Sequence, residues 1–361
     1  MSFLFHAMHD LGASDLHLAS DSRPMLRKDG EMVALGKLPL LHEAMIMELL
    51  KEIVPARNAK EFQECGDTDF AYELKGVGRF RSNLYRDRKG TGAAFRIIPE
   101  KIVTVEDLNL SPKVQNLCFL PKGLVLVTGP TGSGKSTTLS AMIDLVNRKR
   151  EDHIITIEDP IEFVHENKGC LVNQREVGVH TESFKRALRA ALREDPDIVL
   201  VGELRDLETI AIAIETAVTG HLVFGTLHTS GAAQTIDRII DQFPPNQQSQ
   251  IRVMLSDSLK GVISQVLLKK KGGGRVAAME VMIGIPSISN LVREGKTFQI
   301  PSVMQTSKGV GMVTLNDALF ELVKGGTVEA ADAFKSAVDK DGFLALLRRN
   351  NIEFEPGERG A

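Results

Sequence analysis

The chain is poor in aromatic residues and in cysteine: its 361 residues include no tryptophan, two tyrosines and three cysteines. So few aromatic rings argue against a surface that stacks the bases of single-stranded nucleic acid. Cys65, Cys118 and Cys170 form no C-x-x-C pair, which excludes a zinc ribbon and a disulfide framework. Isolated cysteines of this kind favour a reducing compartment.

The chain also lacks a strong excess of either charge and any long apolar run. Lysine and arginine number 44 and the acidic residues 47, a net charge of −3, which argues against binding nucleic acid through bulk charge. The longest stretch free of charged residues, 216–236, contains many polar residues and does not suit a membrane-spanning helix. We therefore expect a cytoplasmic protein with no nucleic-acid partner, which meets the membrane only through other proteins.

The first 98 residues predict a small α+β domain. Alternating polar and apolar residues favour a strand over 14–19, and Asp29-Gly30 between two short apolar runs indicates a hairpin. A helix is expected over 41–52, and further strands over 67–74, 79–86 and 92–98. Residues 99–112 contain two prolines and charges of both signs, and they predict a linker.

Residues 113–361 predict a second domain of the α/β class. Apolar strands alternate with amphipathic helices, which favours a parallel sheet with right-handed crossovers. Strands are expected over 124–128, 153–158, 198–202 and 222–227, and helices over 135–148, 182–193 and 207–218. Beyond Pro286 the pattern predicts a helical C-terminal region, 286–361, with helices over 287–294, 315–323, 328–338 and 342–349.

The clearest chemical signal is a phosphate-binding loop between a predicted strand and a predicted helix. Residues 129–136 read G-P-T-G-S-G-K-S and match G-x-x-x-x-G-K-[ST]. Such a loop binds phosphates with backbone N–H groups, its lysine reaches the β- and γ-phosphates, and its serine hydroxyl ligates Mg²⁺. The pattern predicts a site for ATP and Mg²⁺ made by Gly129, Pro130, Thr131, Gly132, Ser133, Gly134, Lys135, Ser136 and Thr137.

Three further side chains follow apolar runs that predict strands of the same sheet. Glu203 ends one such run and is placed to act near Mg²⁺, through water, although many strands simply end in an acid. Glu158 is a candidate for orienting the attacking water, although Asp159-Pro160 beside it also suits a plain turn. His228 is a candidate contact for the γ-phosphate, with a hydrogen bond at the strand end as the alternative.

A basic segment lies in the predicted N-terminal domain. Residues 79–89 carry several arginines, among them Arg81, and Arg96 follows on the next predicted strand. Arginine suits phosphate binding because its planar guanidinium donates two parallel hydrogen bonds. The alternative is a solvated basic face, which is the usual role of a charge run.

The ordered segments GPTGSGKSTT, TIEDPIEF, ALREDPDIVLVGELRDLETI and TLHTSGAAQTIDRIIDQFP resemble the secretion ATPase superfamily, the type II/IV secretion ATPases. Within it the chain is most similar to the type IV pilus retraction ATPases, from residue 13 to residue 319. The family's Walker A, Asp box, Walker B and His box fall on 129–137, 156–163, 197–206 and 226–239.

The resemblance implies a fold and an assignment of roles. It implies a PAS-like N-terminal domain, a RecA-like core that binds ATP between the two domains, and a hexameric ring. Glu158 would be the catalytic glutamate, Glu203 the Walker B glutamate and His228 the His-box histidine. Arg81 and Arg96 match positions from which the N-terminal domain supplies arginines to the active site.

The resemblance also implies a motor that drives pilus retraction, and so twitching motility, through an inner-membrane platform protein, with a paralogous retraction ATPase as a further partner. Segment 287–296 departs from the helix of the retraction subgroup, because Ser289 stands where that subgroup has arginine. Pilus assembly or type II secretion is therefore an alternative, although the paired-cysteine insert of those relatives is absent. A nucleic-acid translocase and a non-hydrolysing regulatory subunit are further alternatives.

Overall fold

The computed structural model describes residues 1–28, 31–36, 38–98 and 102–355. The chain forms two compact units, one made of Met1–Ile102 and Pro160–Val164, the other of Val103–Asp159 and His165–Ala361. Each unit has its own hydrophobic core, so each is described by itself.

The first unit is an antiparallel sheet with helices on one face. Its described elements are α1 (Ser2–Asp10), β1 (Asp15–Ala19), β2 (Met25–Lys28), β3 (Glu31–Ala34), α2 (Glu43–Lys51), α3 (Ala56–Cys65), β4 (Asp67–Leu74), β5 (Gly78–Asp87) and β6 (Gly90–Ile98). The strand order is β3-β2-β1-β6-β5-β4. Phe5 of α1, Ile46 of α2 and Phe62 of α3 are buried against Phe80 and Phe95 of the sheet.

Most of the elements expected in this unit are present. The strands predicted over 14–19, 67–74, 79–86 and 92–98 are confirmed as β1, β4, β5 and β6, and the helix predicted over 41–52 as α2. Strands β2 and β3 pair antiparallel with Lys28 opposite Glu31, while the hairpin residues 29–30 lie outside the described residues. Helices α1 and α3 were not predicted from the sequence.

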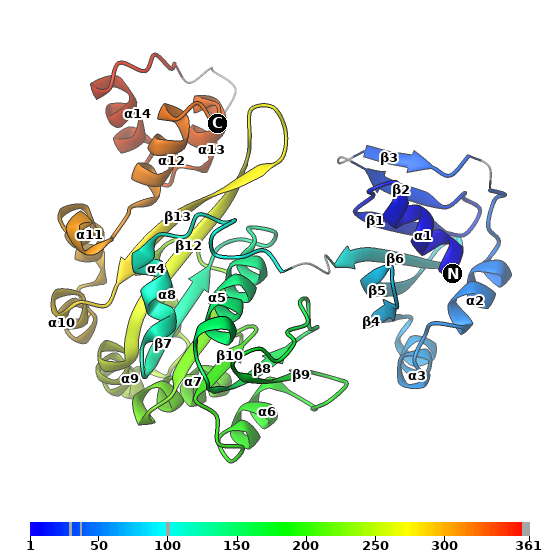
Figure 1. Ribbon diagram of the computed structural model, residues 1–361, viewed down its shortest axis with the longest axis horizontal. Coiled ribbons are helices and arrows are strands. Elements are labelled where there is room, and N and C mark those ends of the chain that lie inside the picture. Colours follow the sequence, from blue (N-terminus) through cyan, green and yellow to red (C-terminus); the bar gives the residue numbers. More distant parts are fainter. Residues whose placement is uncertain (29–30, 37, 99–101, 356–361) are drawn as a thin grey trace. The chain divides into compact units, whose positions relative to one another are not determined.

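The second unit is built around a seven-stranded sheet (Figure 1). Its described elements up to the last strand are α4 (Pro112–Asn116), η1 (Leu117–Phe119), β7 (Gly123–Thr128), α5 (Lys135–Lys149), β8 (His153–Glu158), β9 (Leu171–Glu176), α6 (Phe184–Ala191), β10 (Ile198–Val201), α7 (Leu207–Thr219), β11 (Leu222–Leu227), α8 (Ala232–Asp241), α9 (Pro245–Ser258), β12 (Leu259–Lys269) and β13 (Arg275–Ile283). The strand order is β13-β12-β7-β11-β10-β8-β9.

The sheet is mixed, whereas the sequence predicted a parallel one. Strands β7 to β12 run parallel, and β13 at the edge pairs antiparallel with β12. Strand β13 returns through a short turn, 270–274, and such a turn can only produce an antiparallel pair. Strands β9, β12 and β13, helices α4, α8 and α9 and the short helix η1 were not expected from the sequence, while the other strands and helices of this core were.

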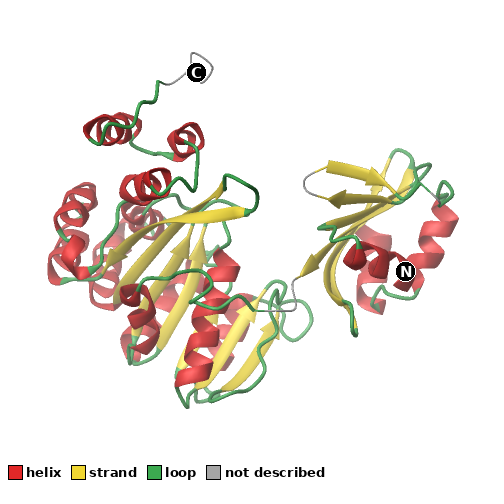
Figure 2. Ribbon diagram, turned by 45° about the horizontal axis from the view of Figure 1, so that its top comes forward, coloured by secondary structure: helices red, strands yellow, loops and turns green. Residues whose placement is uncertain are grey.

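Helices cover both faces of this sheet, and one hydrophobic core lies on each face (Figure 2). Strands β7 and β11 are buried along their whole length, as apolar runs in a doubly covered sheet should be. Leu139, Met142, Ile143 and Val146 form the predicted apolar stripe of α5, and all four are buried. This packing fixes α5 at the carboxyl end of β7.

A helical region ends the chain, as predicted. It contains α10 (Pro286–Glu294), η2 (Thr297–Gln299), α11 (Ile300–Thr306), η3 (Lys308–Val310), α12 (Leu315–Lys324), α13 (Ala330–Ser336) and α14 (Lys340–Arg349). Helices α12, α13 and α14 lie beside the far end of the β12–β13 hairpin, and they share a core with Leu268 and Ala278 (Figure 1). Helix α11 was not predicted.

Part of the segment predicted as a linker is packed on the second unit. Val105 and Leu110 are buried in the core beneath α5, and the Ser111 hydroxyl accepts the Val114 N–H at the start of α4. Residues 99–101 lie outside the described residues. The segment from 103 onward therefore belongs structurally to the second unit.

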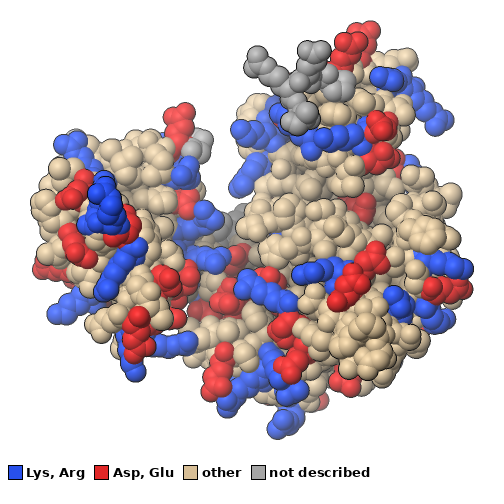
Figure 3. All heavy atoms as spheres, turned by 180° about the vertical axis from the view of Figure 1, so that it is seen from behind, with Lys and Arg blue, Asp and Glu red and all other residues tan. Residues whose placement is uncertain are grey.

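The surface shows no separation of charge on the face drawn in Figure 3, where basic and acidic side chains are interspersed. This pattern agrees with the net charge of −3. Among the described residues, no helix is long and apolar enough to cross a membrane.

Candidate functional site

The phosphate-binding loop lies where the sequence places it, between β7 and the N-terminus of α5. Gly129 has φ +142°, and a Cβ there would lie 2.2 Å from the Gln265 carbonyl oxygen. Gly134 caps α5 in the left-handed conformation with φ +88°. Both positions therefore require glycine, and they let the loop turn tightly into a helix whose first N–H groups lack helical partners.

A residue that the sequence analysis missed braces this loop from the neighbouring strand. Gln265 of β12 is 1% exposed; its Nε2 donates to the Ser133 carbonyl at 2.6 Å, and its Oε1 accepts from the Thr138 hydroxyl at 2.9 Å. It therefore ties the loop to the first turn of α5. The available signal was an amide side chain within the mostly apolar run VISQVLL, since a buried amide requires hydrogen-bond partners.

Lys135, His228 and Glu203 are brought together at the carboxyl edge of the sheet. The Lys135 ammonium donates to the carbonyls of Gly129 at 2.8 Å and Pro130 at 3.2 Å, and lies 3.5 Å from Nδ1 of His228. The other ring nitrogen of His228 lies 3.2 Å from Oε1 of Glu203. The histidine thus connects the loop lysine to the acid at the end of β10.

The carboxyl group of Glu203 is held in its ionised form. Burial alone would raise the pKa of this carboxyl, but Arg205, whose Nε lies 2.6 Å away, and His228 outweigh burial and lower it. An ionised carboxylate beside the loop is a suitable oxygen ligand for Mg²⁺, directly or through water.

Glu158 lies at the end of β8, the strand that pairs with β10 on the side away from β11. Its Oε1 accepts from the Thr156 hydroxyl at 2.6 Å and from Nε2 of Gln174 at 3.1 Å. A Cβ at Gly202 would lie 3.2 Å from the Glu158 Cα, so glycine there allows the two strand ends to approach closely. The carboxylates of Glu158 and Glu203 therefore follow adjacent strands of the sheet.

Arg81 and Arg96 lie on the first unit, on the face of its sheet that the helices leave uncovered. They are direct cross-strand neighbours on β5 and β6, and both side chains are exposed. The Arg96 Nε donates to Oδ1 of Asp15 at 2.8 Å. The exposed face therefore carries a pair of adjacent guanidinium groups.

The residues at the sheet edge fit a nucleotide and its magnesium ion. The glycine-rich loop offers backbone N–H groups and the positive end of α5, which suit phosphate oxygens. The exposed hydroxyl of Ser136 and the carboxylate of Glu203 are oxygen donors of the kind that Mg²⁺ prefers.

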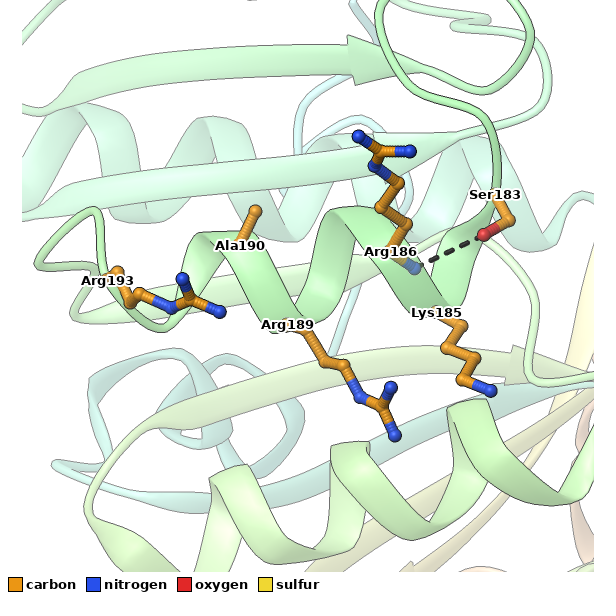
Figure 4. Close-up of a pocket in the computed structure, with 6 residues that line it drawn as sticks. All are labelled: Ser183, Lys185, Arg186, Arg189, Ala190 and Arg193. Atoms are coloured by element: carbon orange, nitrogen blue, oxygen red, sulfur yellow. Dashed lines mark hydrogen bonds between the residues drawn. The ribbon is translucent and has the colours of Figure 1, made fainter.

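The structure also has a basic pocket of about 410 Å³ along α6. It is lined by Ser183, Lys185, Arg186, Arg189, Ala190 and Arg193, none of which belongs to the loop or the strand ends. Figure 4 shows that the charged side chains point in different directions and do not converge on one point. Lys185 pairs with Glu208, and Arg186 with Glu182. We therefore do not assign the nucleotide site to this pocket.

The burial of His165 predicts how the stability of the protein depends on pH. Its side chain is buried, and burial lowers its pKa to about 4 from 6.5. The unfolded chain thus binds a proton between pH 6.5 and 4 that the folded chain does not. As the pH is lowered from 6.5 to 4, the free energy of unfolding should therefore decrease by up to about 3 kcal/mol.

Thermal unfolding of wild type and His165→Gln at pH 7 and pH 5 measures this effect. The variant removes the titrating group, so it should lose less stability on acidification than wild type. His9→Gln, at an exposed histidine of α1, is the control and should keep the wild-type pH dependence. An equal loss for all three proteins would contradict the role of His165.

Known proteins resemble this chain over most of its length. The family model for type II/IV secretion system protein matches residues 11–299. The type IV pilus retractation ATPase PilT of Pseudomonas aeruginosa is 53% identical over 332 residues, which cover 92% of this chain and 96% of that protein. A twitching motility protein of Neisseria gonorrhoeae is 48% identical over 88% of this chain and 85% of its own length.

A solved structure has the same fold. The crystal structure of the pilus retraction motor PilT with bound ADP matches with a TM-score of 0.88 at 47% identity, covering 94% of this chain and 97% of that one. The resemblance inferred from the four ordered motifs is thereby confirmed. The chain belongs to the type II/IV secretion system protein family and has the α/β ATPase fold of its pilus retraction motors.

Proposed function

We propose that this chain is an ATP-hydrolysing motor that works as a homohexamer and drives type IV pilus retraction, and so twitching motility. The observation that carries the proposal is the single sheet edge that gathers the phosphate-binding loop, Glu158, Glu203 and His228, in a chain similar to a pilus retraction ATPase. The motor acts on an inner-membrane platform protein from the cytoplasm, and a paralogous ATPase is a further candidate partner.

The chemistry follows from the side chains at this edge. The loop N–H groups and Lys135 would bind the phosphates, and Ser136, with Glu203 through water, would hold Mg²⁺. When bound, Mg²⁺ neutralises charge on the phosphate oxygens. Glu158 orients the attacking water, and His228 contacts the γ-phosphate while remaining paired to Glu203.

Mechanical work requires movement of one part of the chain against another. We place the moving parts at the PAS-like domain 1–98 and the RecA-like ATPase domain 113–361, joined by residues 99–112. The part of this segment from 103 onward packs on the second unit. ATP binding and hydrolysis change their relative position, and the ring transmits this change to the platform protein.

Deletion of the gene in its host tests the direction of action. Cells that become hyperpiliated and lose twitching motility support retraction, whereas cells without surface pili contradict it. Complementation with wild type should restore twitching. Complementation with Lys135→Ala should not, because that chain lacks the cation of the phosphate site.

One observation favours an assembly or secretion ATPase, or an accessory paralogue, as the second candidate. Helix α10 carries Ser289 where the retraction subgroup has arginine. The later Arg293 of this helix is held to α9 through Asp257 at 3.0 Å. The deletion phenotype separates the candidates, since an accessory paralogue should leave some retraction in place.

Arg81 and Arg96, the neighbouring arginines on β5 and β6, lead to a further prediction. We propose that Arg81 and Arg96 complete a nucleotide site, in their own chain or in a neighbour, by stabilising charge on the transferring phosphoryl group. Arginine fingers elsewhere contribute about a thousandfold or more in rate. Arg81→Ala and Arg96→Ala should therefore bind ATP but lose most of their turnover in a phosphate-release assay.

A mixing experiment decides which chain's site the arginines serve. Arg81→Ala chains mixed with Lys135→Ala chains should regain partial activity if Arg81 acts on a neighbour's site, and none if it acts within its own chain. Arg88→Ala, an exposed arginine of the same basic segment, is the control and should retain activity. Full activity of both arginine variants would return the segment to a solvated basic face.

A further inference from the structure

Gln174 lies beside Glu158 on the neighbouring edge strand, β9. In the parallel pairing of β8 and β9, Gln174 is aligned with Thr156. Glu158 is two residues after Thr156 on β8, so all three side chains lie on the same face of the sheet. Ile154 and Val172, also on this face, are buried in the core beneath α5. The amide of Gln174 and the hydroxyl of Thr156 therefore reach one oxygen of Glu158 from two sides, at 3.1 and 2.6 Å.

The orientation of the Gln174 amide is itself fixed. Its Oε1 accepts the backbone N–H of His165 at 2.7 Å. Because an amide has one acceptor end and one donor end, this bond turns the NH₂ group toward the Glu158 carboxylate. His165 is buried, and its Nε2 lies 3.3 Å from the Ser140 hydroxyl of α5. A continuous set of contacts thus runs from the helix of the phosphate loop to Glu158.

We propose that Gln174 is a positioning residue that holds the Glu158 carboxylate in the orientation that water activation requires. The inference rests on the function proposed above for Glu158. A misplacement of about 1 Å at a reacting group costs about a hundredfold in rate. A hydrogen bond to a charged carboxylate is stronger than one between neutral groups, so Gln174 is well suited to fix that geometry.

A purely structural role would need a different arrangement. Strand β9 is an edge strand whose only strand neighbour among the described residues is β8, and Gln174 is half-buried there. The NH₂ end of its amide donates to Glu158, while the carbonyl end accepts the His165 N–H and fixes the direction of that donor. Loss of the amide should therefore affect turnover more than it affects folding.

Two substitutions test the proposal on the full-length protein with Mg·ATP. Gln174→Met keeps the approximate volume but removes both the donor to Glu158 and the acceptor of the His165 N–H. We expect kcat to fall about 10- to 100-fold while KM and the Kd for ATP stay unchanged. Gln174→Glu keeps the shape and the bond to the His165 N–H, but it faces Glu158 with a second carboxylate. The repulsion should raise the pKa of Glu158 and shift the acidic limb of the kcat–pH profile upward by about one unit or more.

The matched control is Asn173→Asp on the same strand. Asn173 lies on the opposite face, where its side chain contacts Nε2 of His153 at 2.9 Å. This variant adds the same charge one residue away, so its kcat and its acidic limb should match wild type. The other titratable groups on the elements around Glu158 are the same in wild type and in every variant. They are Asp159, His165, Glu176, His180, Glu203 and Arg205.

Glu158→Gln separates failure of this inference from failure of the proposed function. If Glu158→Gln hydrolyses ATP at the wild-type rate, the role of Glu158 is wrong. If Glu158→Gln is inactive while Gln174→Met and Gln174→Glu match wild type, positioning by Gln174 is overturned. A further loss from Gln174→Met in the Glu158→Gln background also overturns it, because the two residues would then act separately. Should Gln174→Met fail to fold, the pH profile of Gln174→Glu alone decides.

Discussion

Lys135→Ala is expected to abolish ATP hydrolysis and to weaken ATP binding about 10- to 100-fold. The ammonium group lies at the loop, within hydrogen-bond distance of the Gly129 and Pro130 carbonyls. Removing it takes away the cation that we propose binds the β- and γ-phosphates, and a hydrogen bond to a charged group contributes about 1.5–3 kcal/mol. The substitution also removes the contact between the Lys135 ammonium and Nδ1 of His228, which lie 3.5 Å apart. Titration calorimetry and phosphate release measure the two effects.

Lys149→Ala is the matched control for this substitution. Lys149 is exposed and lies at the last turn of α5, the same helix that Lys135 begins. The control removes an equal charge from the far end of that helix and should leave ATP binding and turnover unchanged. Normal turnover in Lys135→Ala would show that the loop at 129–137 is not the site of hydrolysis.

The parts of the site that could be predicted from the sequence are those whose signal is local. The phosphate loop needs its glycines, lysine and serine within eight consecutive positions, because one tight turn forms the cradle. Glu158, Glu203 and His228 could be placed at one edge because each follows an apolar run, and parallel strands end at the same edge. The structure brings His228, Glu203 and Lys135 into contact there.

The parts that could not be predicted depend on partners far away in the chain. Gln265 contacts the phosphate loop 132 residues earlier, and it lies on β12, whose pairing with β7 no local pattern indicates. Gln174 lies on an edge strand, LVNQRE, whose two apolar residues are adjacent at its start, so no alternation of polar and apolar residues indicates a strand there. In both cases the residue type is ordinary, and only the register of the sheet gives it a role.

The same limit applies to the N-terminal arginines. The sequence shows a basic segment, but it does not show that Arg81 and Arg96 are cross-strand neighbours or that Asp15, 81 residues earlier, binds Arg96. Because Asp15 is buried, Arg96→Ala leaves a carboxylate with one cation fewer, and this variant should lose stability as well as activity. Arg81→Ala is therefore the cleaner test of catalysis.

Glu158→Gln should bind Mg·ATP normally and hydrolyse it about 10²- to 10⁴-fold more slowly than wild type. The substitution keeps the shape of the side chain and an oxygen that Thr156 and Gln174 can still reach. What it removes is the negative charge that, in the proposed function, polarises the attacking water. Single-turnover hydrolysis, compared with the Kd for ATP, separates this loss from a loss of binding.

Glu203→Gln should also be slow, but for a different reason that magnesium reveals. Its carboxylate is paired to Arg205 and His228. Because we propose that this carboxylate helps to hold Mg²⁺ through water, the amide should bind the ion more weakly. Raising the Mg²⁺ concentration should therefore restore part of the rate of Glu203→Gln and none of the rate of Glu158→Gln. If both variants respond alike across the titration, the two carboxylates do not divide the work in this way, and both act at the same step.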